Sequence, residues 1–266
     1  DEKFSYEYDS MNQLVRENLY YGENNSANST YTYAYDSYGN MLGKNRYAYT
    51  TGSIANKLGI IVAEYQYTDS QWGDLLTAVT DGTVSTGSKQ NNTVSYDEMG
   101  NPTRYFGAAM TWAGKQLKYW GKSGKYVNFA YNEDGIRTLK NSNGVVTNYY
   151  YNGSLLIGMT VGSGSSTRIL RFSYDSSGSV VAVDYSTDNG TTFNTYYYLR
   201  NAQNDIVKLI DSSGSTVVEY CYDSWGKPLS TSGSLASALG KDNPFRYRGY
   251  VFDEETGFYY LQSRYY

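Results

Sequence analysis

One short phrase recurs along the chain and limits what the chain can fold into. The phrase is a Tyr followed by Asp or Asn, two further residues and Gly, and a strand-forming residue usually stands two positions before the Tyr. Copies occur as "YAYDSYGN" (33–40), "VSYDEMGN" (94–101), "FAYNEDGI" (129–136), "FSYDSSGS" (172–179) and "YCYDSWGK" (220–227). Looser variants fill the gaps, so the chain is a repeat array.

Each part of the phrase has a structural reason. Alternate residues of a strand share one face, so the Tyr-x-Tyr form places two rings side by side. Asp or Asn at the strand end accepts hydrogen bonds from backbone amides ahead of it and starts a turn, and Gly three residues later suits a positive φ. We therefore predict hairpin turns that begin and end at the pairs Asp36 and Gly39, Asp97 and Gly100, Asp175 and Gly178, and Asp223 and Gly226.

Repeat spacing predicts an all-β fold. Tyr151, Tyr174, Tyr198 and Tyr222 are 23, 24 and 24 residues apart, which is the length of one hairpin. About 20 strands at about 4.8 Å each would span about 95 Å, and open sheets rarely exceed about 10 strands without curling. The fold class we predict is a continuous array of antiparallel β-hairpins in a curled, spiralling sheet.

Composition removes several classes of function. The chain has 22 Lys and Arg against 26 Asp and Glu, so it shows no electrostatic footprint for nucleic acid. It has no His, which excludes Ser-His-Asp and Cys-His catalysis, and its one cysteine, Cys221, excludes an internal disulfide. No apolar run reaches the length of a membrane span. We expect no cofactor and no metal.

The C-terminal stretch "NPFRYRGYVFDEETGFYYLQSRYY" (243–266), together with the repeats, resembles one family. This family is the YD-repeat or Rhs proteins, which include bacterial Rhs and wall-associated polymorphic toxins, the B and C subunits of insecticidal Tc toxins and, more distantly, teneurins. The stretch resembles the Rhs-associated core motif of that family. The matching residues are Arg246, Gly249, Asp253, Thr256, Gly257, Tyr259, Tyr260, Arg264, Tyr265 and Tyr266.

The resemblance implies both an architecture and a role. In the family, YD repeats wind into a hollow β-cage that encloses a C-terminal toxin or an unfolded polypeptide, and the core motif lies where the shell is closed. We accordingly divide the chain into a shell segment, 1–240, and a core motif, 241–266. The implied partners are the remainder of the same shell and an enclosed toxin, and the implied location is secreted or at a bacterial cell surface.

Self-cleavage is a further property that the resemblance implies. An Arg matching Arg264 works there with aspartates that follow the core motif, in chemistry like that of an aspartyl protease. This sequence carries Arg264 but stops at Tyr266, and we expect it to be cut at both ends from something longer. We therefore predict a protein that is not an enzyme.

Three features leave alternatives open. Asp253, Glu254 and Glu255 are consistent with an acid pair or a calcium site, but a hairpin turn capped by Asp253, with Gly257 at positive φ, is the favoured interpretation. The repeated Asp residues, Asp211 among them, are consistent with cation binding, although turns explain each one.

Trp72 lies in a stretched turn and is the best candidate for a glycan-stacking ring. The alternative function is therefore a surface adhesin that binds glycan or a partner protein through aromatic rows.

Overall fold

The computed structural model describes residues 2–82 and 90–266, which belong to two compact units. The first unit spans Asp1–Met110 and the second spans Thr111–Tyr266. The predicted division at residue 240 rests on the C-terminal motif rather than on compactness, and it stays a prediction.

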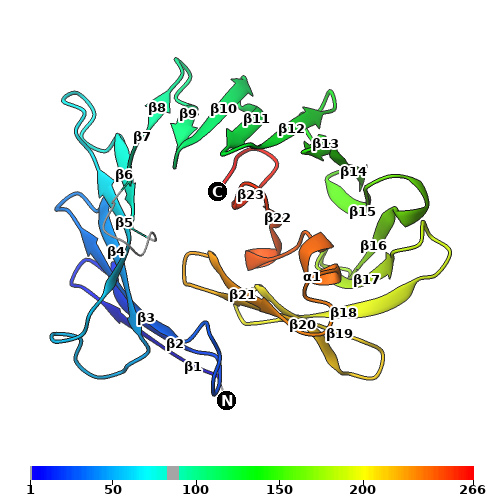
Figure 1. The fold of residues 1–266 in the computed structure, drawn as a ribbon, viewed down its shortest axis with the longest axis horizontal. Helices are drawn as coiled ribbons and strands as arrows, with labels where there is room; N and C mark the ends of the chain where they lie inside the picture. Colours follow the sequence, from blue (N-terminus) through cyan, green and yellow to red (C-terminus); the bar gives the residue numbers. More distant parts are fainter. Residues whose placement is uncertain (1, 83–89) are drawn as a thin grey trace. The chain divides into compact units, whose positions relative to one another are not determined.

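The first unit is built from short antiparallel strands (Figure 1). They are β1 (Lys3–Tyr8), β2 (Leu14–Tyr20), β3 (Ser29–Tyr35), β4 (Met41–Ala48), β5 (Ile60–Gln66), β6 (Ala78–Asp81), β7 (Gln90–Thr93), β8 (Ser95–Tyr96), β9 (Pro102–Tyr105) and β10 (Ala108–Ala113), the last of which extends past the unit boundary. Strands β1 to β7 form one sheet in chain order, as expected when each hairpin follows the previous one.

The second unit continues the same pattern and ends in a different kind of segment. Its strands are β11 (Gln116–Lys122), β12 (Lys125–Tyr131), β13 (Arg137–Ser142), β14 (Val145–Asn152), β15 (Leu155–Val161), β16 (Arg168–Tyr174), β17 (Val180–Ser186), β18 (Asn194–Arg200), β19 (Ile206–Ile210), β20 (Thr216–Tyr222), β21 (Pro228–Ser232), β22 (Val251–Asp253) and β23 (Phe258–Tyr260). Its helical turns are η1 (Gly164–Ser166), α1 (Leu239–Asp242) and η2 (Tyr247–Gly249).

Strands β11 to β21 lie in chain order within one antiparallel sheet, whereas β22 and β23 pair only with each other. Figure 1 shows that β11 to β21 curve around the chain's final residues, from α1 to the C-terminus. The predicted fold class, an array of antiparallel hairpins in a curled sheet, is confirmed.

The turn phrase has the same geometry in each copy. At Asp36, carboxylate oxygen Oδ1 accepts the N–H of Tyr38 at 2.8 Å and that of Asn40 at 2.9 Å. The Gly39 N–H donates to the Asp36 carbonyl at 3.2 Å, and Gly39 has a φ of +90°. This is a type I turn followed by a bulge at Gly, and the strand register shifts beside Tyr35 accordingly. The arrangement recurs at Asp97, Asp175, Asp211 and Asp223.

Six tyrosines at strand ends, most of them just before a turn Asp or Asn, tie neighbouring hairpins together. The Tyr35 hydroxyl donates to the Leu14 carbonyl at 2.9 Å, and Leu14 begins β2, the second strand of the preceding hairpin. Tyr222 donates in the same way to Ile206, which begins β19, at 2.9 Å. Equivalent bonds are made by Tyr67, Tyr96, Tyr131 and Tyr174. The repeated Tyr therefore satisfies a backbone carbonyl at the start of a strand.

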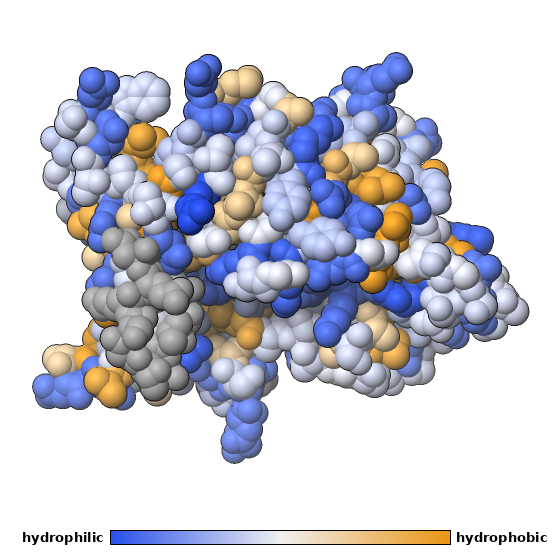
Figure 2. Space-filling model, turned by 45° about the horizontal axis from the view of Figure 1, so that its top comes forward, coloured by the Kyte–Doolittle hydropathy of each residue, from blue (hydrophilic) through white to orange (hydrophobic). Residues whose placement is uncertain are grey.

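The two faces of the second unit's sheet differ in exposure. On β14, Tyr149 is 5% exposed while its neighbour Tyr150 is 50% exposed, as strand alternation requires. The buried side chains of β14 to β20 form one hydrophobic core with the chain's final residues. On the molecular face in Figure 2, hydrophobic residues lie in small patches between polar ones. The side of the sheet that packs is thus the one that meets the C-terminal residues.

We expect Tyr222→Phe to lower the free energy of unfolding by about 1 kcal/mol. The substitution removes a buried hydroxyl and leaves the Ile206 carbonyl without its donor. Tyr197→Phe on β18 is the control, because that ring is 44% exposed, and it should change stability by less than about 0.5 kcal/mol. Urea denaturation measures the free energy of unfolding of each variant. Equal losses would contradict a stabilising role for the Tyr222 hydroxyl.

Candidate functional site

The C-terminal segment, residues 239–266, packs on the inner side of the curved sheet. Its buried side chains Leu239, Phe245, Tyr247 and Tyr259 belong to the same core as strands β14 to β20. Hydrogen bonds also connect it to distant positions: the Tyr259 hydroxyl donates to the Gly226 carbonyl at 2.7 Å. The segment therefore forms the second layer that this part of the sheet needs to bury its apolar face.

A buried ion pair fixes the segment to β13. The Arg137 guanidinium donates to both carboxylate oxygens of Asp253, at 2.5 Å from Nη1 and 3.1 Å from Nη2. Both side chains are fully buried. The bidentate geometry is the strong form of this interaction and specifies orientation as well as distance.

Aromatic rings surround the Arg137 guanidinium. Its central carbon lies 5.1 Å from the ring centre of Phe129, 5.0 Å from that of Tyr149 and 4.3 Å from that of Tyr260. Ring faces attract cations most strongly where water is excluded. The Tyr260 hydroxyl also accepts the backbone N–H of Arg137 at 2.9 Å. The core-motif residues Asp253 and Tyr260 thus contact the same arginine.

Lys140 extends the charged cluster. Its ammonium group lies 2.8 Å from Glu255 and 3.4 Å from Asp253. Burial alone raises the pKa of the Asp253 carboxyl, but the charges of Arg137 and Lys140 outweigh burial and hold that pKa below its ordinary value. Asp253 is therefore ionised wherever the unit is folded near neutral pH.

Arg246 organises the start of the C-terminal segment. Its side chain is 1% exposed, stacks 4.0 Å from the ring centre of Tyr220, and donates to the Tyr220 hydroxyl at 2.9 Å. It also donates to the carbonyls of Asn243 and Gly240 and, at 3.1 Å, to Glu254. An arginine that satisfies several carbonyls at once holds an irregular loop in a single conformation.

The chain's last residues pack on the far side of the same cluster. The hydroxyl oxygens of Tyr131 and Tyr265 lie 2.6 Å apart, and the Tyr265 ring contacts Trp112 and Phe129. Burial raises the pKa of Tyr131 to about 12, so the hydroxyl stays neutral. Tyr265 thus extends the ring cluster around Arg137.

Other core-motif residues shape the backbone or remain at the surface. Gly249 and Gly257 have φ values of +70° and +73°, which L side chains rarely adopt. Arg264 is exposed and lines a small cavity of about 360 Å³ with Trp225, Tyr266 and others. The structure therefore does not bring Arg264 into the buried charge cluster.

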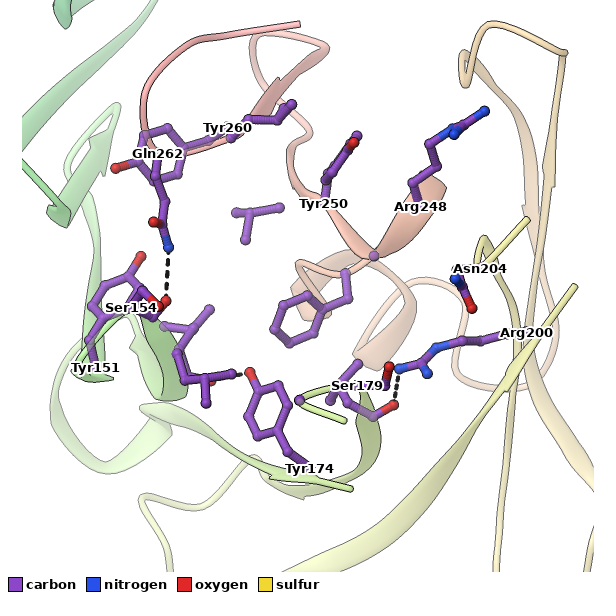
Figure 3. A pocket seen from close by; sticks show the side chains of 18 residues that line it. Tyr151, Ser154, Tyr174, Ser179, Arg200, Asn204, Arg248, Tyr250, Tyr260 and Gln262 are labelled. Carbon is purple, nitrogen blue, oxygen red and sulfur yellow. Dashed lines mark hydrogen bonds between the residues drawn. The ribbon is translucent and has the colours of Figure 1, made fainter. Parts of the chain in front are cut away.

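A larger cavity lies between the C-terminal segment and the turns of the sheet. Its volume is about 470 Å³, and Figure 3 shows its lining. At one end the Gln262 amide donates to the Ser154 carbonyl at 2.8 Å; at the other lie Arg200, Asn204 and Arg248. Hydrophobic side chains also line the cavity. They are Leu155, Leu156, Val180, Phe245, Val251 and Leu261.

Asp253 differs from the role that the sequence predicts. Glu254 to Gly257 do form the turn between β22 and β23, with Gly257 at positive φ. The Asp253 carboxylate does not cap that turn, because Arg137 and Lys140 bind it. Among residues 2–82 and 90–266, no group of three or more carboxylate or thiol side chains is placed to hold a metal ion.

Trp72 lies in the first unit and is 67% exposed. Its backbone N–H donates to Asp69 at 2.8 Å, so a turn presents the ring to solvent. Arg137, Lys140 and Tyr220 bind residues of the C-terminal segment, and none of the three is predicted from the sequence. For Arg137 and Lys140 the one signal is a charged residue at an inward position of a strand.

Comparison with known proteins supports the resemblance at the level of the fold. No family model matches the chain. Solved structures of a TcdB2–TccC3 complex and of a TcdB2–TccC3–Cdc42 complex match all of it, with TM-scores of 0.60 and 0.59 and 15% identity, over 16% and 15% of their own chains. A Photorhabdus luminescens Tc holotoxin pore matches with a TM-score of 0.53. The fold is therefore of the Rhs or YD-repeat kind.

Curated relatives come from Bacillus. The tRNA3(Ser)-specific nuclease WapA of Bacillus spizizenii is 36% identical over 220 residues, and the tRNA nuclease WapA of Bacillus subtilis strain 168 is 34% identical over 220 residues. Each alignment covers 77% of this chain and 9% of the relative. The tRNA(Glu)-specific nuclease WapA of Bacillus subtilis subsp. natto is 36% identical over 180 residues, 66% of this chain and 7% of the relative. The chain spans less than a tenth of the length of these proteins.

These names correct one prediction. We predict from the sequence that the protein is not an enzyme, and relatives named as tRNA nucleases contradict this. The prediction depends on the lack of His and of partners for Arg264, and both arguments concern only these 266 residues. It is wrong because an activity can belong to parts of a protein that a segment of this length does not include.

We expect Asp253→Asn to lower the free energy of unfolding by about 3–5 kcal/mol, because it leaves the Arg137 charge buried without its counter-ion. Glu219→Gln is the matched control. It breaks a pair with Lys208 whose two side chains are 28% and 32% exposed, and should cost about 0–1 kcal/mol. Denaturant unfolding compares the two variants, and similar losses would contradict the special role of the buried pair.

The contribution of Asp253 should depend on pH in one direction. Its folded-state pKa lies below the ordinary value of about 3.9, so the stabilisation is complete above that pH and is lost as pH falls through the folded pKa. The difference in unfolding free energy between wild type and Asp253→Asn should be constant from pH 5 to pH 8 and shrink below about pH 4. A difference that shrinks on raising the pH toward 8 would contradict the assignment.

Proposed function

We propose that the chain is a wall segment of a YD-repeat shell that encloses a toxin of the same protein. The observation that carries the proposal is that the C-terminal segment packs on the inner side of the curved sheet, held there by the buried Arg137–Asp253 pair. The end of the wall and the residues that follow it in a longer protein are thereby directed to the enclosed side. Under this proposal the core motif, 241–266, fixes the end of the wall segment at the point where the chain enters the enclosed space.

The relatives support an identity for the cargo. Proteins named as tRNA nucleases share this segment at 34–36% identity, and the segment is under a tenth of their length. We propose that the full-length protein is a polymorphic toxin with nuclease activity, and that this wall isolates the nuclease until delivery. Its partners are then the rest of the shell and the enclosed toxin, and its location is secreted or at a bacterial cell surface. No described helix is long and apolar enough to cross a membrane.

Residue roles follow from the same proposal. The turn residues Asp36, Gly39, Asp97, Gly100, Asp175, Gly178, Asp223 and Gly226 close the hairpins of the wall, and Arg246, Gly249, Gly257, Tyr259 and Tyr265 shape or attach the core motif. Arg264 takes the self-cleavage role that the family resemblance implies. The adhesin alternative depends mainly on Trp72, and an exposed indole in a turn does not favour it over the wall.

Containment can be measured in the full-length protein that carries this segment. We expect the intact protein to cleave tRNA slowly and its nuclease part to resist added protease. Asp253→Asn, which weakens the attachment of the core motif, should raise both tRNA cleavage and protease sensitivity by about tenfold or more. Glu219→Gln should leave both at the wild-type level.

Two results would argue against containment. One is a wild-type protein whose nuclease part is digested as fast as the isolated nuclease. The other is full tRNA cleavage by the intact wild-type protein without any opening step.

A further inference from the structure

We propose that the 470 Å³ cavity beside the C-terminal segment is a groove that binds a short, extended, acidic stretch of polypeptide. This inference rests on the proposed function, because the occupant it names is a segment of the enclosed toxin. The groove would then hold the cargo against the wall at one defined place. We call this cavity the rim groove.

Three turns of the sheet form one side of the rim groove. Ser154 lies in the turn between β14 and β15, Gly178 and Ser179 in the turn between β16 and β17, and Asn204 in the turn between β18 and β19. In an antiparallel sheet these alternate turns share one edge, two strand spacings or about 10 Å apart. The three turns therefore extend over about 19 Å, the length of about six residues of extended chain.

The C-terminal segment forms the other side. Arg248, Gly249, Tyr250 and Val251 line the groove from η2 and the start of β22, and Tyr260 to Gln262 line it from the end of β23. Arg248 and Gln262 both have positive φ, at +52° and +62°, and so turn the backbone along this side of the groove. Such strained positions occur where the surrounding structure imposes a specific shape.

The chemistry of the lining changes along the groove. Figure 3 shows Arg200, Asn204 and Arg248 on one side of the cavity, and Tyr151, Ser154, Tyr260 and Gln262 on the other. Side chains of carbon alone lie between the two sides in this view, and the lining includes aliphatic residues and Phe245. A ligand that fits this order has a carboxylate at one end, an apolar middle, and amide or hydroxyl groups at the other end. A stretch of polypeptide offers all three.

The lining of the groove holds no acidic side chain. Two carboxylates lie close to its cationic end, where Asp205 acts electrostatically on Arg248 and Asp175 acts on Arg200. Arg200 also donates to the Val180 carbonyl. Asp205 is 4% exposed and accepts the backbone N–H of Arg248 and the side-chain amide of Asn201. Asp175 accepts the Ser177 hydroxyl and the amides of Ser177 and Ser179. An arriving carboxylate thus meets two guanidinium groups whose neighbouring carboxylates are also held by other donors, and it finds no carboxylate in the lining itself.

Two other ligand classes fit less well. A nucleic-acid strand brings a phosphate with each nucleotide, whereas the groove offers arginine at one end only. No tryptophan lines the groove, so it lacks the large flat face on which a sugar ring stacks. Both classes serve as probes in the test.

Fluorescence anisotropy of labelled synthetic peptides tests the inference. We expect a hexapeptide of alternating Glu and Leu to bind the 266-residue protein much more tightly than its Lys–Leu counterpart does. Its binding should weaken as the salt concentration is raised from about 50 to 500 mM. Arg200→Gln and Arg248→Gln should each weaken binding about tenfold, the size expected for one lost charged contact. Arg171→Gln is the control, because Arg171 is an exposed arginine on β16 that does not line the groove.

Several outcomes would overturn the inference. These are no binding of the acidic peptide, equal binding of the acidic and basic peptides, equal weakening by Arg171→Gln, or binding only of a uridine oligonucleotide or a cello-oligosaccharide. Melting temperatures of the variants identify any that fail to fold, and the two groove variants make the test independent of either one. A protein that protects its toxin from protease but binds no acidic peptide would refute the rim groove while leaving the wall proposal intact.

Discussion

The contact between Arg137 and Asp253 is the constraint on which the second unit depends. The two residues are 116 positions apart, yet they meet with both side chains fully buried. A buried ion pair contributes little net stability compared with an apolar pair of the same shape, because desolvation offsets the attraction. It does penalise every arrangement in which either charge is buried alone. We infer that the pair selects one position of the C-terminal segment on the sheet.

The repeats solve the opposite problem, which is to build a long sheet from local information. Each Asp–Gly turn is closed by its own side chain and backbone, and a Tyr before most of these turns bonds to a carbonyl near the start of a neighbouring strand. These contacts span about 14 to 26 residues, so each hairpin can be positioned by its neighbour as it forms. Local contacts thus position each hairpin in the sheet, whereas one long-range contact positions the C-terminal segment.

This difference explains what could be predicted from the sequence. The turns and the strand order follow from motifs a few residues long, and so does the burial of alternate tyrosines. Asp253 was assigned to a turn cap because its neighbours, Glu254 to Gly257, carry a real turn signal. Its partner, Arg137 on β13, lies 116 positions away, so no local sequence pattern indicates the contact. The cage, by contrast, is an implication of the family resemblance. No motif in these residues predicts the nuclease activity that the names of the relatives give.

The residues around the C-terminal segment also limit how the second unit responds to pH. The chain has no histidine, the side chain whose ordinary pKa lies near neutrality. Burial raises the pKa of core tyrosines such as Tyr198 and Tyr220, so they stay neutral, and the arginine and lysine beside Asp253 keep it charged. The buried groups around the C-terminal segment therefore keep one charge state across the range where histidine switches act. Under the wall proposal, a modest change of pH would supply no protonation step at Asp253, Tyr198 or Tyr220, so it would not by itself release the segment.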